Sequence, residues 1–221
     1  MPPILASWLQ AAVDTREEFE DLAGIYLPIG IAVAVIIFGL VGFALIRYRR
    51  RDDRLPNQRA SMTWAEVSYA LLLAVIVAVL LAFSFRATDD IAALDDDPGV
   101  RVDVTAFQWN WRFTYPGEDV TVVGTNNRPA TLVVPSDRTV RFSLTSRDVI
   151  HAFWIPEVRF KRDAFPKRET EFDLTFDELG ESTGRCAEFC GLDHDAMTFD
   201  VVVMKPDDFE SWLATQRKGT S

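Results

Sequence analysis

Ligand-type side chains gather in one short segment near the end of the chain. The sequence holds only two cysteines and two histidines, and three of these four residues, Cys186, Cys190 and His194, lie close together, with Met197 just beyond them. Copper sites that transfer electrons favour soft thiolate and thioether sulfur together with imidazole nitrogen. This segment therefore offers the ligand atoms of an electron-transfer copper site.

Plainer explanations compete with a copper site. Cys186 and Cys190 could form a disulfide in an oxidising compartment, or the cluster could hold a structural zinc ion, which is usually bound by four Cys or His ligands. Neither explanation uses Met197. The other histidine, His151, lies at the end of a predicted strand, so it could supply a second imidazole from a neighbouring loop or be an ordinary buried histidine. Residue types alone leave both interpretations of His151 open.

Two long apolar segments precede this cluster. Residues 22–46 and 67–85 carry no charged side chain, and a helix needs about 20 apolar residues to cross the hydrocarbon core of a bilayer. A soluble protein could hold such segments only as buried core helices. The charged residues 14–21 and the length of the first segment are unlike a cleaved signal peptide. We therefore predict a transmembrane hairpin over residues 22–86 with a retained first helix.

The distribution of arginine predicts the orientation of this hairpin. Six arginines lie in residues 47–59, between the two apolar segments, whereas acidic residues flank the outer ends. Cytoplasmic loops carry an excess of Lys and Arg, so we expect the linker, residues 47–63, to be cytoplasmic. Residues 1–21 and 87–221 then lie on the external face of the membrane, and the retained first helix suggests that this is a prokaryotic plasma membrane.

Acidic side chains dominate the part of the chain after the hairpin. Residues 87–221 hold 15 Lys and Arg against 25 Asp and Glu, which accounts for nearly the whole net charge of −10. This charge repels nucleic acid and attracts a basic protein. We therefore predict a basic protein partner steered by surface carboxylates, with Asp148 and its neighbours as the residues to neutralise.

The hydrophobic period changes from helical to two after residue 99. Alternating apolar residues, separated by turn sequences such as Pro116-Gly117, predict short strands in an all-β sandwich or a small barrel over residues 87–221. The tail places Phe209, Trp212 and Leu213 at helical spacing, which predicts a short helix over residues 206–216. The predicted strands cover residues 100–107, 131–134, 139–145, 169–176 and 198–204.

Three blocks of the sequence resemble subunit II of cytochrome c oxidase. The ligand segment fits the family pattern C-x-E-x-C-G-x-x-H-x-x-M, and residues 146–168, SRDVIHAFWIPEVRFKRDAFPKR, resemble the block that contains the family's upstream copper ligand. Residues 107–117, FQWNWRFTYPG, resemble its aromatic block. With the hairpin, the resemblance covers about residues 22–212. It implies an α+β membrane protein in which a two-helix transmembrane hairpin is followed by a cupredoxin-like Greek-key sandwich.

The resemblance also implies a dinuclear copper centre of the copper A type. The two cysteines would bridge the two ions, each histidine would bind one ion, and the methionine would be a weak ligand. Near this centre, Lys167 stands where the family usually has glycine and Ser182 where it often has tyrosine. The implied ligand set is His151, Cys186, Glu188 through its carbonyl, Cys190, His194 and Met197.

Three further roles follow from the resemblance. Trp109 would be the point where electrons enter from cytochrome c, and the side chain of Glu188 would reach a magnesium ion at the interface with subunit I. Glu66, at the start of the second predicted helix, resembles the family glutamate at the mouth of a proton channel. Around Glu66 the chain departs from the family, with Tyr69 for the usual tryptophan and Leu73 for the usual proline.

The resemblance therefore implies the electron-accepting subunit of a proton-translocating oxidase. It would take single electrons from cytochrome c and pass them to haem in subunit I, which reduces oxygen to water. The implied partners are oxidase subunits I and III, the lipid bilayer, and cytochrome c. Because the sequence has no C-x-x-C-H haem motif, this cytochrome c would be a separate protein or a subunit of a partner complex. A quinol oxidase subunit with a structural role only is the alternative, since it shares the hairpin and the sandwich but lacks the copper ligands. A nitrous-oxide reductase would need histidines beyond His151 and His194.

Overall fold

The computed structural model describes residues 15–49, 61–125 and 128–219. Most of the predicted external segment 1–21 and most of the predicted linker 47–63 therefore lie outside the described residues. The chain divides into two units, of which one, Glu20–Thr88, holds the helical hairpin and the other holds the strands.

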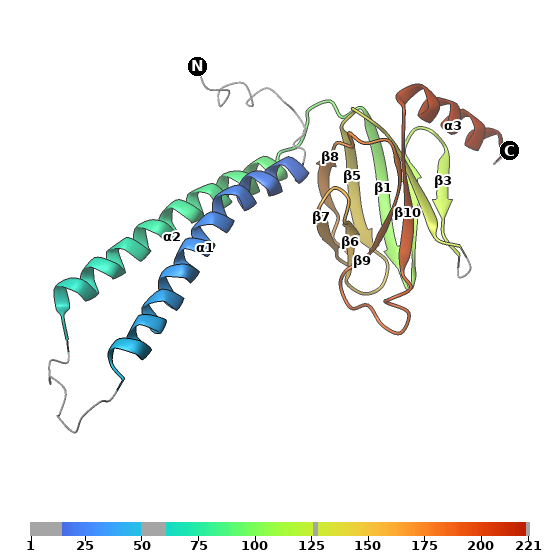
Figure 1. Cartoon of the computed structure of the whole chain (residues 1–221). Coiled ribbons are helices and arrows are strands. Elements are labelled where there is room, and N and C mark those ends of the chain that lie inside the picture. The colour runs from blue at the N-terminus through green and yellow to red at the C-terminus, as the bar shows by residue number, and fades with distance from the viewer. Residues whose placement is uncertain (1–14, 50–60, 126–127, 220–221) are drawn as a thin grey trace, which may run out of the picture. The chain divides into compact units, whose positions relative to one another are not determined.

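Two long helices form the hairpin, as expected from the apolar segments (Figure 1). Helix α1 (Thr15–Arg47) and helix α2 (Thr63–Ala92) extend beyond those segments at both ends. Acidic residues in the first turn of α1, Glu17 and Glu18, favour this extension because they face the positive end of the helix dipole. The hydroxyl of Tyr26 links the two helices, since it lies 2.8 Å from the Leu80 carbonyl oxygen and 2.6 Å from Ser84 Oγ.

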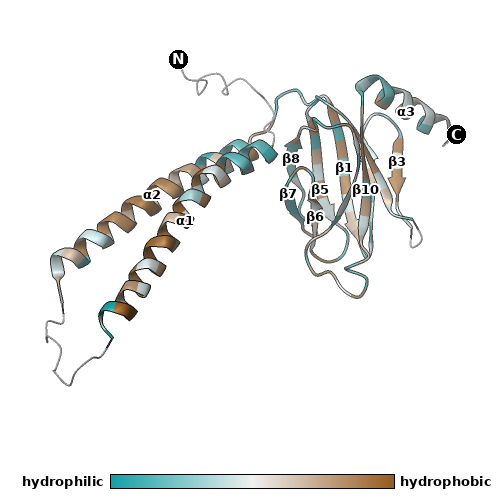
Figure 2. Ribbon diagram, viewed as in Figure 1, coloured by the Kyte–Doolittle hydropathy of each residue, from teal (hydrophilic) through white to brown (hydrophobic). Residues whose placement is uncertain are grey.

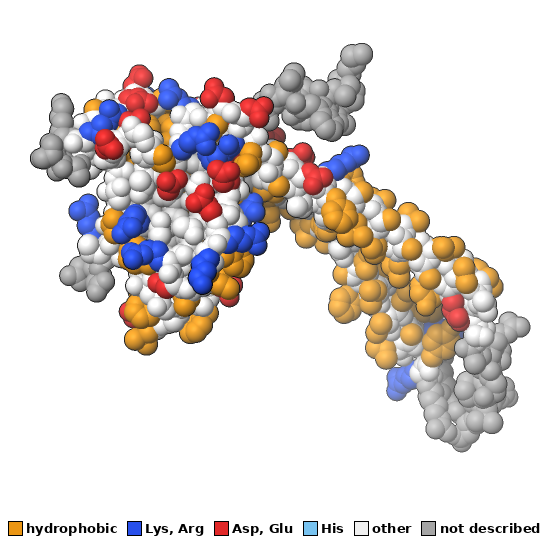
Figure 3. Space-filling model, turned by 180° about the vertical axis from the view of Figure 1, so that it is seen from behind, with side chains coloured by type: hydrophobic (Ala, Val, Ile, Leu, Met, Phe, Trp, Pro, Cys, Tyr) orange, Lys and Arg blue, Asp and Glu red, His pale blue; other side chains and the backbone are white. Residues whose placement is uncertain are grey.

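The hairpin exposes its apolar side chains. Figure 2 shows hydrophobic residues along the middle of both helices and hydrophilic residues toward their ends, and Figure 3 shows the same apolar covering. Both helices are long and apolar enough to cross a membrane, and the most hydrophobic stretch of each buries none of its residues within the protein. A buried core helix, the soluble alternative, would show the opposite pattern, so lipid is the solvent that this surface fits.

Ten strands form two five-stranded sheets in the other unit, with the orders β3-β2-β1-β5-β8 and β4-β10-β9-β6-β7. β1 pairs with β5 and β4 pairs with β10 in parallel, and the other pairs are antiparallel. The strands are β1 (Val100–Phe107), β2 (Asn110–Tyr115), β3 (Val120–Val123), β4 (Ala130–Pro135), β5 (Val140–Ser146), β6 (His151–Ile155), β7 (Phe160–Ala164), β8 (Thr170–Leu174), β9 (Gly180–Cys186) and β10 (Thr198–Met204).

Aromatic side chains fill the space between the two sheets. Alternation along each strand directs apolar side chains into this space. In β1, Val102, Val104 and Ala106 are buried while Arg101 and Asp103 on the other face are exposed. The five strands predicted from this alternation all form. The largest buried rings are Trp111, Tyr115, Phe113, Phe142, Phe153, Phe172, Phe199 and Phe209.

The C-terminal helix closes one end of this core. Helix α3 (Pro206–Gly219) packs Trp212 at 5.3 Å and Phe209 at 6.2 Å from the Tyr115 ring, measured between centroids. The Tyr115 hydroxyl donates to the Val133 carbonyl and accepts from the Val133 amide, which joins the two sheets. The helical spacing predicted for this tail is therefore confirmed.

β9 has no apolar alternation, and its sequence, GESTGRC, does not predict a strand. Gly184 explains how β9 fits beside β10 in the sheet. A Cβ atom at this position would lie 2.0 Å from the Phe199 ring on neighbouring β10, so the missing side chain makes room for that ring. β9 ends at Cys186 and thereby places the first ligand candidate.

Candidate metal centre

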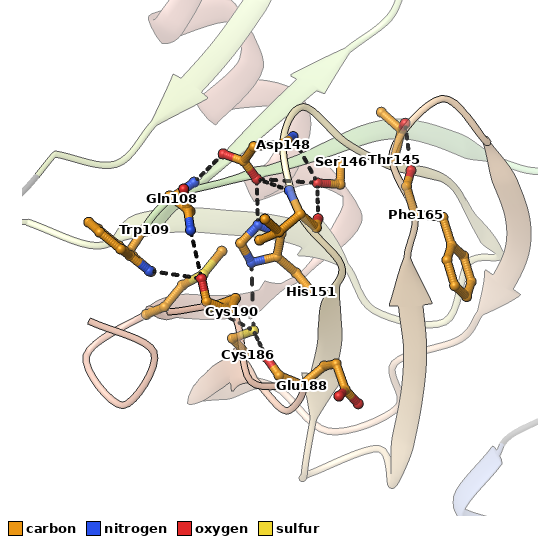
Figure 4. Close-up of polar contacts among 12 residues, drawn as sticks. Gln108, Trp109, Thr145, Ser146, Asp148, His151, Phe165, Cys186, Glu188 and Cys190 are labelled. Atoms are coloured by element: carbon orange, nitrogen blue, oxygen red, sulfur yellow. Dashed lines mark hydrogen bonds and ion pairs between the residues drawn. The ribbon is translucent and has the colours of Figure 1, made fainter. Parts of the chain in front are cut away.

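Four segments converge at one end of the sandwich. β6 begins at His151, and its pairing with β9 sets Phe153 opposite Cys186, which brings the histidine beside the cysteine. The ligand loop, residues 186–197, is closed at its neck because the Cys186 amide donates to the Met197 carbonyl over 2.9 Å. The turn between β1 and β2, at Gln108 and Trp109, supplies the fourth segment (Figure 4).

All six predicted ligand residues come together, with four of them around the sulfurs of the two cysteines. Cys186 Sγ lies 3.8 Å from Cys190 Sγ, and this pair forms the middle of the site. Around it, His151 Nδ1 lies 3.8 Å and the Glu188 carbonyl oxygen 3.2 Å from Cys186 Sγ. His194 Nδ1 lies 3.5 Å and Met197 Sδ 3.8 Å from Cys190 Sγ.

The cluster is buried at its centre and open at its rim. His151, Cys186, Cys190 and Met197 are buried, and His194 is half-buried. The side chain of Glu188 is exposed although its carbonyl points at Cys186. Both cysteines are free thiols, and their separation is far longer than the roughly 2.05 Å of a disulfide bond. The disulfide explanation is therefore wrong for this structure.

Asp148 fixes which nitrogen of His151 faces the sulfurs. The Nε2 atom of His151 lies 2.8 Å from Asp148 Oδ1, and the backbone amides of Val149 and Gln108 donate to the same carboxylate over 2.7 Å. With Nε2 held in this way, Nδ1 is the nitrogen available to bind a metal, which is the orientation found in carboxylate–histidine–metal sites. We expected Asp148 to be a steering carboxylate. Its side chain is 31% exposed, but its contacts make it a support of the ligand.

The surroundings of the two thiols shift their pKa values in opposite directions. Burial alone would raise the pKa of Cys186, but hydrogen bonding with His151 and with backbone groups outweighs it and lowers this pKa to about 6. Burial and the nearby negative charge of Cys186 raise the pKa of Cys190 to about 12. The pKa of His151 is raised because contacts with Cys186 and Asp148 outweigh its burial. Of the two thiols, Cys186 is therefore the one that loses its proton first.

Trp109 contacts the ligand loop from the β1–β2 turn. Its indole Nε1 donates to the Cys190 carbonyl over 3.2 Å, and the ring is half-buried. The Gln108–Trp109 peptide bond is cis. Gln108 donates from Nε2 to the same carbonyl over 2.8 Å, a contact that motif spacing did not reveal. The only sequence feature that could have pointed to Gln108 is its position next to Trp109.

The structure also shows the local surroundings of the other residues that the sequence singled out. Glu66 belongs to the hairpin, where its Oε1 accepts the Met62 amide over 3.0 Å at the start of α2. Lys167, at a usual glycine position, has a φ of 62°, a left-handed conformation that glycine adopts more readily. Ser182 lies half-buried on β9. Tyr69 and Leu73 are exposed on α2.

Comparison with known proteins gives one consistent family. Residues 118–205 match the family model described as "Cytochrome C oxidase subunit II, periplasmic domain". A probable cytochrome c oxidase subunit 2 of Streptomyces avermitilis is 33% identical over 83% of this chain and 70% of its own length. A probable cytochrome c oxidase subunit 2 of Nocardia farcinica is 30% identical over 86% of this chain and 68% of its own length.

A solved structure shows the same fold for the strand-bearing unit. The periplasmic domain of subunit II of cytochrome oxidase (CoxB) of Bradyrhizobium japonicum superposes with a TM-score of 0.52 at 29% identity. The match covers 57% of this chain and 98% of that domain. The fold is therefore a two-helix hairpin followed by a cupredoxin-like sandwich, in a membrane protein with an external domain. Sequence, fold and assembled ligand loop agree, and the chain belongs to the cytochrome c oxidase subunit II family.

Proposed function

We propose that this chain is the electron-accepting subunit of a cytochrome c oxidase and that its site holds a dinuclear copper A centre. One observation carries the proposal: two unbonded thiols lie 3.8 Å apart at the centre of a set that also presents an imidazole nitrogen to each sulfur. Two sulfurs at this spacing can be shared by two metal ions. The buried Met197 thioether adds a soft donor that suits copper.

The residues of the site have separate tasks. His151, Cys186, Cys190, His194, Met197 and the Glu188 carbonyl would hold the metal. When bound, a dinuclear copper centre supplies one-electron redox chemistry. Asp148 keeps the His151 ring in one orientation, and burial of the sulfurs excludes water from them. Trp109 links the surface to a ligand residue through its hydrogen bond to the Cys190 carbonyl.

The two remaining alternatives fit the site less well. A structural zinc ion has no use for the buried Met197, which lies 3.8 Å from Cys190 Sγ. A quinol oxidase subunit with a structural role only would have no reason to assemble two thiols and two imidazoles. The copper site uses all of these side chains.

The proposed partners follow from the family and from charge. Subunits I and III would surround the hairpin in a prokaryotic plasma membrane, with the 47–63 linker cytoplasmic. The exposed Glu188 carboxylate would contribute to a magnesium site completed by subunit I. Glu66 would serve proton uptake, although its contact with the Met62 amide also suits a helix-capping role. Copper and magnesium contents of the purified complex, and proton uptake by a Glu66→Gln variant, test these assignments.

Exposed acids on the ligand loop suit a basic cytochrome c. Asp193 and Asp195 are exposed beside the site and, unlike Asp148, have no hydrogen bond to a ligand ring among the described contacts. Neutralising both to asparagine should raise the KM for cytochrome c and flatten its dependence on salt, because ions screen long-range attraction. An unchanged salt dependence would count against steering by these residues.

Electron acceptance is tested by rapid mixing of reduced cytochrome c with the copper-loaded full chain in detergent. The Trp109→Leu variant should slow cytochrome c oxidation by about tenfold or more, equivalent to about 1.4 kcal/mol of barrier, with copper content unchanged. Trp154→Leu is the matched control, because Trp154 is also half-buried but lies on β6 outside the site. Equal rates for the two variants would contradict the role of Trp109, and no oxidation by the unaltered chain would contradict the proposed function.

A further inference from the structure

The carbonyl oxygen of Cys190 accepts two side-chain hydrogen bonds from the β1–β2 turn. Gln108 Nε2 donates over 2.8 Å and Trp109 Nε1 over 3.2 Å, and Figure 4 shows both side chains pointing at this oxygen. The thiol of the same residue forms half of the central sulfur pair. A constraint on the carbonyl is therefore also a constraint on the peptide that carries a proposed metal ligand.

Gln108 also reaches the other side of the site. Its backbone amide donates to Asp148 Oδ2 over 2.7 Å, and Asp148 Oδ1 lies 2.8 Å from Nε2 of His151. One residue thus contacts the support of an imidazole with its backbone and the carbonyl of a thiol residue with its side chain. Among the described contacts, no other residue outside the ligand set joins the cysteine loop to the carboxylate that holds His151.

The turn and the ligand loop are packed closely enough for these bonds to set the geometry. A Cβ atom added to Gly191, the residue after Cys190, would lie 3.1 Å from Gln108 Nε2 and 3.2 Å from the Trp109 ring. Gly191 also has a φ of 123°, a conformation that favours glycine. The loop can therefore lie directly against the amide of Gln108 and the indole of Trp109.

We propose that Gln108 is a positioning residue for the copper centre. By holding the Cys190 carbonyl, it fixes both the ligand peptide and the acceptor of the Trp109 N–H, so that the surface indole and the sulfur ligand keep one relative placement. This inference rests on the proposed function. Hydrogen bonds around a metal ligand orient it and tune the electronic properties of the metal, so Gln108 should influence the reduction potential and the spectrum of the centre.

The test uses the full chain in detergent, loaded with copper. Gln108→Leu removes the amide donor at similar size, and Gln108→Glu places an acceptor where the carbonyl needs a donor. Gln216→Leu on α3 makes the same chemical change outside the site and is the control. The measurements are copper content, redox titration, the copper hyperfine pattern in electron paramagnetic resonance, and the rate of cytochrome c oxidation.

We expect both Gln108 variants to keep the unfolding temperature of the control while the reduction potential and hyperfine pattern change. Electron transfer should slow by about two- to tenfold, equivalent to about 0.4–1.4 kcal/mol of barrier. Loss of copper from a folded Gln108 variant, with copper retained by the control, would also support positioning. Potential, spectrum and rate that match the control would overturn this inference and leave the proposed function standing. An unaltered chain without a dinuclear copper signal would overturn both.

Discussion

The hairpin and the sandwich use the same apolar residue types in opposite ways. Phe38 on α1 is 77% exposed, whereas Phe172 on β8 is 1% exposed and lies in contact with other rings. The hairpin therefore depends on an apolar solvent around it, while the sandwich makes its own dry interior. Only the second arrangement can hold buried thiols and an imidazole in fixed positions, so the two regions should respond differently to the same substitution.

The largest difference is expected at glycine. Gly184→Val in β9 would force a side chain into the Phe199 ring, because even its Cβ would lie 2.0 Å from that ring. A Cβ atom added at Gly42 in α1 would have no neighbouring atom within 4 Å outside its own helix backbone, so Gly42→Val is the matched variant. We expect the first variant to lose the folded sandwich and all copper binding and the second to keep both. Near-ultraviolet circular dichroism and copper analysis of the full chain in detergent measure this, and a folded, copper-binding Gly184→Val chain would refute the packing account.

A second pair of variants compares a buried ring of the sandwich with an exposed ring of the hairpin. Phe172→Ala removes a buried ring that stacks on Phe142 at 5.2 Å, and such truncations cost about 3–5 kcal/mol of unfolding free energy. Phe38→Ala removes a ring of the same size from the exposed face of the hairpin and should leave the sandwich unaffected. Chemical unfolding of the sandwich in both full-length variants gives the two values. Equal losses would show that the regions are not energetically distinct.

The two regions should also differ in their response to pH. Copper needs deprotonated ligands, and the pKa of Cys190 is raised to about 12 by burial and by Cys186, while that of His151 is also raised. The proton on Cys190 therefore competes with copper at neutral pH, and the raised pKa of His151 strengthens proton competition at that imidazole. Apparent copper affinity should rise about tenfold per pH unit for each proton displaced, or about 1.4 kcal/mol per unit.

Competition with a chelator at two pH values, one below and one above neutrality, measures this dependence. Residues 22–46 of the hairpin carry no Asp, Glu, Lys, Arg or His, so the helical signal of that segment serves as the internal control and should not change. An affinity that is independent of pH would contradict the separation of the two thiol pKa values.

The smallest expected difference concerns two tyrosine hydroxyls. Tyr115→Phe would leave the buried amide and carbonyl of Val133 without their side-chain partner, at a cost of about 1–3 kcal/mol. Tyr26→Phe removes the contacts with Leu80 and Ser84 inside the hairpin, where hydrogen bonds between membrane helices average about 0.6 kcal/mol. Thermal unfolding of each variant gives the order, and a larger effect at Tyr26 would reverse it.

Composition and period predicted the parts of the fold that depend on local pattern. The uncharged segments identified both long helices, and the alternation in residues 100–107 identified β1 with the bounds that the structure has. β9 was missed because its place depends on Phe199 of the neighbouring strand, which needs the space at Gly184. A strand whose place depends on a contact with its neighbour need not show alternating apolar residues in its own sequence.

In the candidate site, too, the residues close together in sequence were predictable and those brought together by folding were not. Spacing within residues 186–197 was enough to suggest the sulfur and imidazole cluster, whereas His151 needed the family resemblance because it comes from a distant strand. The contacts of Asp148 and Gln108 with the proposed ligand residues were not predicted, since these contacts join segments that meet only in the folded sandwich. The sequence identifies the carboxylate of Asp148 and the amide of Gln108 but not the groups to which they hydrogen-bond.

Electron paramagnetic resonance of the copper-loaded full chain tests the central claim most directly. If Cys186 and Cys190 share two ions, the spectrum will show one unpaired electron spread over two copper nuclei, and the signal will be lost in a Cys190→Ser variant. A spectrum of isolated mononuclear copper in the unaltered chain, or no bound copper, would contradict the assignment of this site.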